Sequence, residues 1–181
     1  MASVMLDLET LATTHDAVVL TIGAVKFNAF SLQEPFDELY MRVNIDEQIA
    51  KGRDIEEATM TWWGNQDPVV QEEAFSSDNR ESVADMLNAL NKFLVGVDKI
   101  WCQGPHFDIT ILETLFKQYG IPRNWDFWQI MDSRTLFSVH GDPRDKNSKT
   151  LHNAVEDCKS QARGVQQTFR KLGITKYAGR I

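Results

Sequence analysis

The chain has 181 residues, a length that suits one hydrophobic core, so we expect residues 1–181 to form a single domain. Its net charge of −7 is unlike that of proteins that bind nucleic acid tightly without sequence preference, which are usually basic. No apolar run is long enough to span a bilayer and no signal segment opens the chain, so we expect a cytoplasmic location, with Cys102 and Cys158 as reduced core thiols.

Apolar periodicity and turn residues divide the chain into strands and helices. Strands are predicted at 3–9, 17–28, 36–44, 97–102 and 129–132. Helices are predicted at 55–63, 66–75, 80–96, 107–119 and 151–172, with a polar loop at 140–149. Three meandering strands followed by strands with crossover helices predict an α/β fold, in which a mixed sheet carries helices on both faces.

Two acids, Asp7 and Glu9, lie one residue apart in the first predicted strand. Residues i and i+2 of a strand point to the same face, so these carboxylates share a face with Met5 while the other face is apolar. Two carboxylates on one face repel each other unless a positive charge lies between them. The pattern fits a metal site on a sheet, but a bare D-x-E more often marks two solvated acids on an edge strand.

A third acid, Asp108, falls in the first turn of the helix predicted at 107–119. Gly104 and Pro105 end the strand before this helix, and Gly120 ends the helix. An acid in this place either contributes to a metal site or stabilises the helix dipole, an effect of roughly 0.3–1 kcal/mol. The local pattern does not separate these two roles.

A fourth acid, Asp157, lies in the last predicted helix, one residue before its apolar stripe. The residues of this stripe are Cys158, Ala162, Val165, Phe169 and Leu172. Asp157 therefore flanks the buried face of the helix. Because Asp7, Glu9 and Asp108 are also candidate ligands, we interpret Asp157 as a metal ligand rather than as a solvated residue at the border of the stripe.

One histidine, His152, precedes Asp157 by five residues, too far for the two side chains to be neighbours on one helix face. Asn153 and Glu156 could form a capping box, which would place His152 just before the cap. At this entrance a neutral imidazole can take a proton from water near pH 7. A lone histidine in the same place would more often be a surface residue.

Three motifs in this order resemble the DEDDh, or DnaQ-like, group of 3′→5′ exonucleases. The first is D-x-E-T at 7–10 with IGAV at 22–25, the second is F-D-x-x-x-L at 107–112, and the third is H-x-x-x-x-D at 152–157. Each motif alone is weak, whereas the three together cover nearly the whole chain. The chain is most similar to a compact bacterial and phage branch described as exoribonuclease-like or exonuclease VIII-like. The resemblance implies a ribonuclease H-like fold.

The resemblance also implies the reaction and its cofactors. The enzyme would hydrolyse phosphodiester bonds from the 3′ end of RNA or single-stranded DNA and release nucleoside 5′-monophosphates. Two Mg²⁺ or Mn²⁺ ions, both of which prefer oxygen ligands, would be held by Asp7, Glu9, Asp108 and Asp157. Such ions, about 3.5–4 Å apart, activate water and stabilise the leaving oxygen, with His152 as the general base. The ions would balance four of the acids that produce the net charge of −7.

The resemblance suggests where substrate binds, with one departure from the family pattern. Many members carry Asn where this chain has Gly104, and we expect Gln103 to supply the amide instead. Thr10 and Leu11 would pack against the terminal base and sugar, and Phe107 could stack on a base. The side chains expected to contact substrate are Thr10, Leu11, Gln103, Phe107 and Arg134.

The expected partner is single-stranded or 3′-overhanging nucleic acid, and no membrane. Adjacent Trp62 and Trp63 cannot both be buried on one helix stripe, so one should face a base or a second copy of the chain in a homodimer. Two other functions fit the same acids: a ribonuclease H-like endonuclease, and a catalytically inactive nucleic-acid-binding module on the same fold. His152 argues against the first, and the complete set of acids argues against the second.

Overall fold

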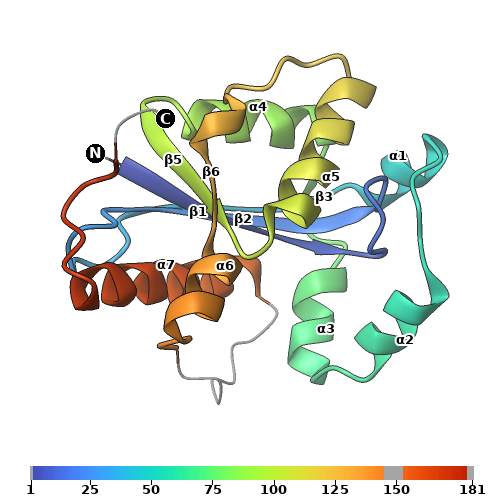
Figure 1. The fold of residues 1–181 in the computed structure, drawn as a ribbon. Helices are drawn as coiled ribbons and strands as arrows, with labels where there is room; N and C mark the ends of the chain where they lie inside the picture. The colour runs from blue at the N-terminus through green and yellow to red at the C-terminus, as the bar shows by residue number, and fades with distance from the viewer. Residues whose placement is uncertain (1, 145–152, 179–181) are drawn as a thin grey trace.

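The computed structural model describes residues 2–144 and 153–178, which build a six-stranded sheet with helices on both faces (Figure 1). The strands are β1 (Ala2–Thr10), β2 (Val19–Phe27), β3 (Asp37–Val43), β4 (Arg80–Glu81), β5 (Val97–Cys102) and β6 (Ile130–Asp132). Their order across the sheet is β4-β3-β2-β1-β5-β6. Strands β1, β2 and β3 are antiparallel, whereas β5 runs parallel to β1 and to β6. The predicted mixed α/β sheet is confirmed.

The helices lie in two layers. They are α1 (Ile45–Ala50), α2 (Glu57–Gly64), α3 (Pro68–Phe75), α4 (Val83–Phe93), α5 (Pro105–Gln118), α6 (Ser133–His140) and α7 (Ala154–Lys171), with a short 3₁₀ helix, η1 (Phe127–Gln129), before β6. Figure 1 shows α4 and α5 on one side of the sheet and α6 and α7 on the other. Strand β1 lies between these layers, with an antiparallel neighbour on one side and a parallel neighbour on the other.

Alternation along β1 divides its side chains between the two layers, as predicted. Val4, Leu6 and Leu8 belong to the core beneath α4 and α5. Met5 belongs to the core beneath α7. Because Asp7 and Glu9 follow Met5 at steps of two, the sheet presents both acids on the α7 side.

A third, smaller core lies under α2 and α3, and it separates the two adjacent tryptophans. Trp63 is 2% exposed and its indole Nε1 donates a hydrogen bond to the carbonyl oxygen of Thr10. Trp62 is 41% exposed. This agrees with the prediction that the two rings could not both be buried.

Several elements differ from those predicted. Helix α1 and helix α6 were not predicted, and the helix expected at 80–96 is shorter, with β4 and the capping residue Ser82 before α4. Helix α7 begins at Ala154, because the Asn153 side chain accepts from the amides of Val155 and Glu156. Leu172 was expected in the apolar stripe of this helix and is 46% exposed, since it follows the last helical residue as the C-cap.

Two sequence-based expectations about the interior and the membrane can be compared with the described residues. Cys102 and Cys158 are free and buried. Within 2–144 and 153–178, none of the helices combines the length and the apolar character that a bilayer-spanning segment needs.

Candidate metal centre

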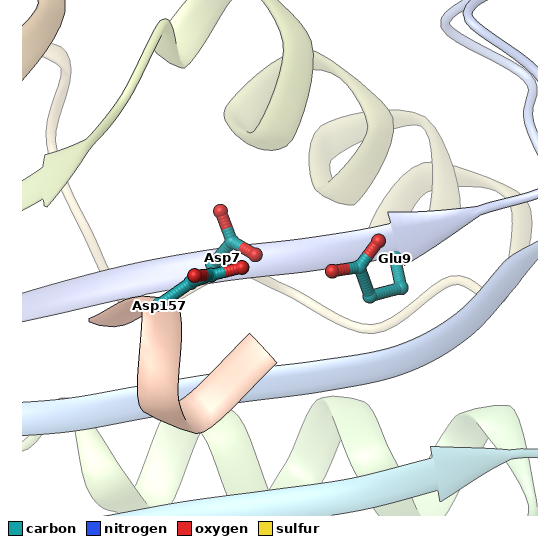
Figure 2. A group of neighbouring side chains, drawn as sticks. All are labelled: Asp7, Glu9 and Asp157. Atoms are coloured by element: carbon teal, nitrogen blue, oxygen red, sulfur yellow. The ribbon is translucent and has the colours of Figure 1, made fainter. Parts of the chain in front are cut away.

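Three carboxylates meet on the α7 side of β1, at the carboxyl end of the strand (Figure 2). Asp7 and Glu9 come from the strand and Asp157 from the first turn of α7. One oxygen from each of the three lies within 4.8 Å of the others. Two oxygens bound to one divalent cation are separated by at most about 4–5 Å, twice the usual metal–oxygen distance. The spacing therefore fits a hard divalent cation held by all three side chains.

Glycine at position 23 allows Asp157 to approach this strand. Gly23 of β2 lies opposite Asp7 in the antiparallel register. A Cβ atom at Gly23 would lie 2.3 Å from the backbone carbon of Ala154, the first residue of α7, a distance that real Cβ atoms essentially never show. The Cys158 thiol also lies 3.4 Å from the Gly23 carbonyl oxygen. The N-terminal turn of α7 therefore lies directly on β2, which brings Asp157 next to Asp7.

Asp108 reaches the same strand from the opposite layer. The β1–β5 pairing ends at Met5 and Trp101, so the amide of Leu8 has no partner in that ladder. The Asp108 carboxylate, in the first turn of α5, accepts this amide at 3.1 Å. Asp108 is 3% exposed and lies outside the group of three carboxylates, but close enough to raise the pKa of Asp7 and of Glu9.

The cluster is electrostatically unfavourable without a cation. Burial, with Asp157 and Asp108 as further causes, raises the pKa of Glu9 from 4.5 to about 9. Burial and the neighbouring carboxylates raise the pKa of Asp7 well above its ordinary value. Burial raises the pKa of Asp108 to about 7, although the Leu8 amide and Arg134 act in the opposite direction. A divalent cation would offset this repulsion, and oxygen-only donors suit a hard ion such as Mg²⁺ or Mn²⁺.

Gln161 also touches the acids, although sequence reasoning did not select it. Its side-chain Nε2 lies 3.4 Å from Asp7 Oδ1, and the residue is 4% exposed. Gln161 follows Asp157 by four residues and therefore lies one turn further along the same side of α7. A polar residue between the buried stripe positions Cys158 and Ala162 was the available signal.

A hollow of about 780 Å³ opens beside Glu9. The end of β1, helix α2 and Phe107 line it, with Thr10, Glu56 and Trp62 among the lining residues. Two of the residues expected to contact substrate, Thr10 and Phe107, therefore border both the hollow and the acid cluster. The glutamates of α2 were not singled out from the sequence.

The structure distributes the other expected substrate residues differently. Leu11 is buried in the core under α2 and α3. Gln103 and Arg134 lie together at the end of β5, where Arg134 Nη2 donates to the Gln103 carbonyl oxygen at 2.8 Å. Gly104, which follows Gln103, has a φ of 111°, a conformation that favours glycine. Arg134 is near enough to Asp108 to lower the pKa of that carboxyl.

The proposed general base, His152, lies outside the described residues. Its neighbour Asn153 is described and forms the N-cap of α7. The helix that carries Asp157 therefore begins two residues after His152 in the sequence.

A sequence model of one nuclease family matches almost the whole chain. The Rv2179c-like 3′-5′ exoribonuclease domain matches residues 2–169, a range that includes all four acids and His152. No curated protein sequence matches significantly.

Several solved exonucleases share the fold at low sequence identity. Exonuclease I from Methylocaldum szegediense gives a TM-score of 0.64 at 13% identity, over 94% of this chain and 40% of that one. E. coli exonuclease I in complex with a dA16 oligonucleotide gives 0.62 at 14% identity, over 94% and 42%. Exonuclease X in complex with 5′ overhanging duplex DNA gives 0.60 at 14% identity, over 94% and 93%. The chain thus spans about two fifths of the exonuclease I chains and nearly all of exonuclease X.

Proposed function

Because this chain belongs to the Rv2179c-like 3′-5′ exoribonuclease family and is a DEDDh-type 3′→5′ exonuclease, we propose that it removes nucleotides by a two-metal mechanism with a histidine base. The observation that carries the proposal is the approach of Asp7, Glu9 and Asp157, whose ligand oxygens lie within 4.8 Å of one another. Residues 1–181 would act as one exonuclease domain, and the products would be nucleoside 5′-monophosphates.

Each acid has a distinct place in the proposed site. Asp7, whose pKa is affected by all three other carboxylates, would help to hold both ions. Glu9 and Asp157 would complete the site that holds the attacking water, and Asp108 would act on the second ion through water, since its carboxylate already accepts the Leu8 amide. The ions, Mg²⁺ or Mn²⁺, would activate the water and stabilise the charge on the leaving 3′-oxygen.

His152 would take the proton from the attacking water. In the sequence it directly precedes Asn153, the N-cap of the helix that carries Asp157. A neutral imidazole with an unperturbed pKa of about 6.5 suits proton removal near neutral pH.

The hollow beside Glu9 is where we place the 3′-terminal nucleoside. Phe107 offers an aromatic face on which a base can stack. The described residues that line the hollow include glutamates and no lysine or arginine, so a base or sugar is favoured there over a phosphate. Arg134, at the end of β5, is the nearby cation suited to the substrate backbone.

We propose single-stranded or 3′-overhanging nucleic acid as the substrate, with RNA first because the matching family is one of exoribonucleases. The complex of E. coli exonuclease I with dA16 gives a structural precedent for a single strand on this fold. We also propose a homodimer in which the exposed Trp62 of α2 contributes to the interface.

The test is the digestion of 5′-labelled RNA and DNA oligomers of one sequence with Mg²⁺, Mn²⁺ or a chelator. We expect a ladder of shortened strands that keep the 5′ label, and release of mononucleotides from the 3′ end. No reaction is expected with the chelator. A circular single strand should stay intact, and the Asp7→Asn protein should be inactive. Cutting of the circle would support an endonuclease instead. No metal-dependent shortening of any linear strand would overturn the proposal.

A further inference from the structure

Within residues 2–144 and 153–178, the side chain of Gln161 makes one hydrogen bond, and its partner is Asp7 of the acid cluster. The amide Nε2 lies 3.4 Å from Asp7 Oδ1, and the side chain is buried between β1 and α7. The other amide atom, Oε1, is buried without a hydrogen-bond partner among the described residues. Among the described residues, the hydrogen bond to Asp7 is therefore the one that orients this amide.

The chemistry of the two groups determines which atom of the Gln161 amide faces Asp7. An ionised carboxylate only accepts hydrogen bonds, so it selects the NH₂ side of the amide. The two oxygens of a carboxylate offer about four lone-pair sites. Asp7 can therefore accept from Gln161 and still offer lone pairs to cations.

Gln161 is the side chain from α7 that donates a hydrogen bond to Asp7 within the acid cluster. Asp108 receives the equivalent help from the backbone amide of Leu8. Asp7 thus accepts from a side chain of α7, whereas Asp108 accepts from the backbone of β1.

We propose that Gln161 is a positioning residue that holds the Asp7 carboxylate in the orientation required for metal binding. The inference rests on the proposed function, because it assigns Gln161 a role toward the ions of that site. Gln161 would contact neither substrate nor cation. Partners that orient metal ligands typically contribute roughly 10- to 100-fold to metal affinity or activity.

The test is direct titration of the metal-free full chain with Mn²⁺ by calorimetry, for wild type and Gln161→Met. Methionine keeps the length of the side chain and removes the donor. We expect Mn²⁺ binding to weaken roughly 10- to 100-fold. In oligonucleotide assays the Mn²⁺ concentration for half-maximal rate should rise similarly, while KM for the oligonucleotide at saturating Mn²⁺ stays unchanged. Gln167→Met, at an exposed position of the same helix, should behave as wild type.

Thermal melting without metal separates positioning from a purely structural role. Gln161→Met also removes an unpartnered buried oxygen, so the metal-free protein should melt no lower than wild type. If the Met variant fails to fold, Gln161→Asn keeps an amide at shorter reach and should show an intermediate loss of Mn²⁺ affinity. A folded variant with wild-type Mn²⁺ affinity would overturn the inference. A wild type that binds Mn²⁺ but shortens no strand would instead count against the proposed function.

Discussion

At the scale of one residue, Glu9 shows that burial and neighbouring carboxylates oppose ionisation of an acid in this site. Its pKa is raised from 4.5 to about 9, first by burial. A raised carboxyl pKa means that the folded protein binds the proton more tightly than the unfolded chain. The contribution of this bound proton to the free energy of unfolding is fully present below pH 4.5 and is lost as the pH rises toward 9. The metal-free protein should therefore melt at a lower temperature at about pH 8 than at about pH 5.

Asp7→Asn should abolish hydrolysis and relieve part of this repulsion. Its metal-free melting temperature at about pH 8 should equal or exceed that of wild type, because one buried charge is gone. Wild type should gain thermal stability from Mg²⁺ or Mn²⁺, and the variant should gain much less. Calorimetric melting across this pH range in a chelator, and then with metal, measures both effects. Normal turnover by Asp7→Asn would show that the site is wrongly assigned.

The histidine before the α7 cap is tested by His152→Ala. Loss of a general base should lower turnover by roughly 10²–10⁴-fold. Metal-dependent stabilisation should persist, because His152 is not proposed as a ligand. The acidic limb of the rate–pH profile should flatten in the variant. A wild-type rate would assign His152 to the surface and leave another group as the base.

At the scale of elements, the contact between α7 and β2 determines whether the site exists. Gly23→Ala would place a methyl group against the backbone of Ala154, so the helix must move away from the strand that carries Asp7. We expect a loss of roughly 1–3 kcal/mol in unfolding free energy and weaker Mn²⁺ binding. Denaturant unfolding and metal titration measure the two effects.

Gly64→Ala is the matched control for this prediction. A Cβ at Gly64, the last residue of α2, meets nothing within 4 Å. Alanine there should leave metal binding unchanged and stability equal or higher by up to about 1 kcal/mol. Equal behaviour of the two variants would mean that the close approach at Gly23 does not hold Asp157 in place.

Elements with strong apolar periodicity were predictable, and those defined by tertiary contacts were not. The face of β1 that carries Asp7 and Glu9 follows from strand alternation, and the α5 stripe follows from helical spacing. Helix α6 escaped prediction because it is only eight residues long and buries only Ser133 and Phe137, which is too short a pattern to separate from a loop. The two-residue strand β4 exists only through its pairing with β3.

At the scale of the whole molecule, the sheet order explains why residues far apart in the sequence meet. The strand order reverses between β1 and β5, and ligand sites on α/β sheets form outside the carboxyl ends of the strands at such points. The three motifs could be predicted to converge there through the family resemblance. Gln161 and the lining of the hollow could not, because both depend on how α7 and α2 lie against β1.

Self-association is the prediction that concerns the whole molecule. Trp62 is 41% exposed on α2, and tryptophan is enriched at protein interfaces because its ring gives a large apolar area. Sedimentation at micromolar concentration should give twice the chain mass of 20.7 kDa, and Trp62→Ser should shift the population toward that single mass. A wild-type protein that sediments only at the single mass would reject the homodimer.

The bond between the Leu8 amide and Asp108 has a consequence for hydrogen exchange. This amide lies beyond the last β1–β5 pair and is protected by a side chain from α5 rather than by a neighbouring strand. Its exchange should therefore follow the opening of the first turn of α5, while amides within the β1–β2 ladder follow larger unfolding events. The exchange rate of this one amide would then measure the free energy of separating the first turn of α5, which carries Asp108, from β1, which carries Asp7 and Glu9.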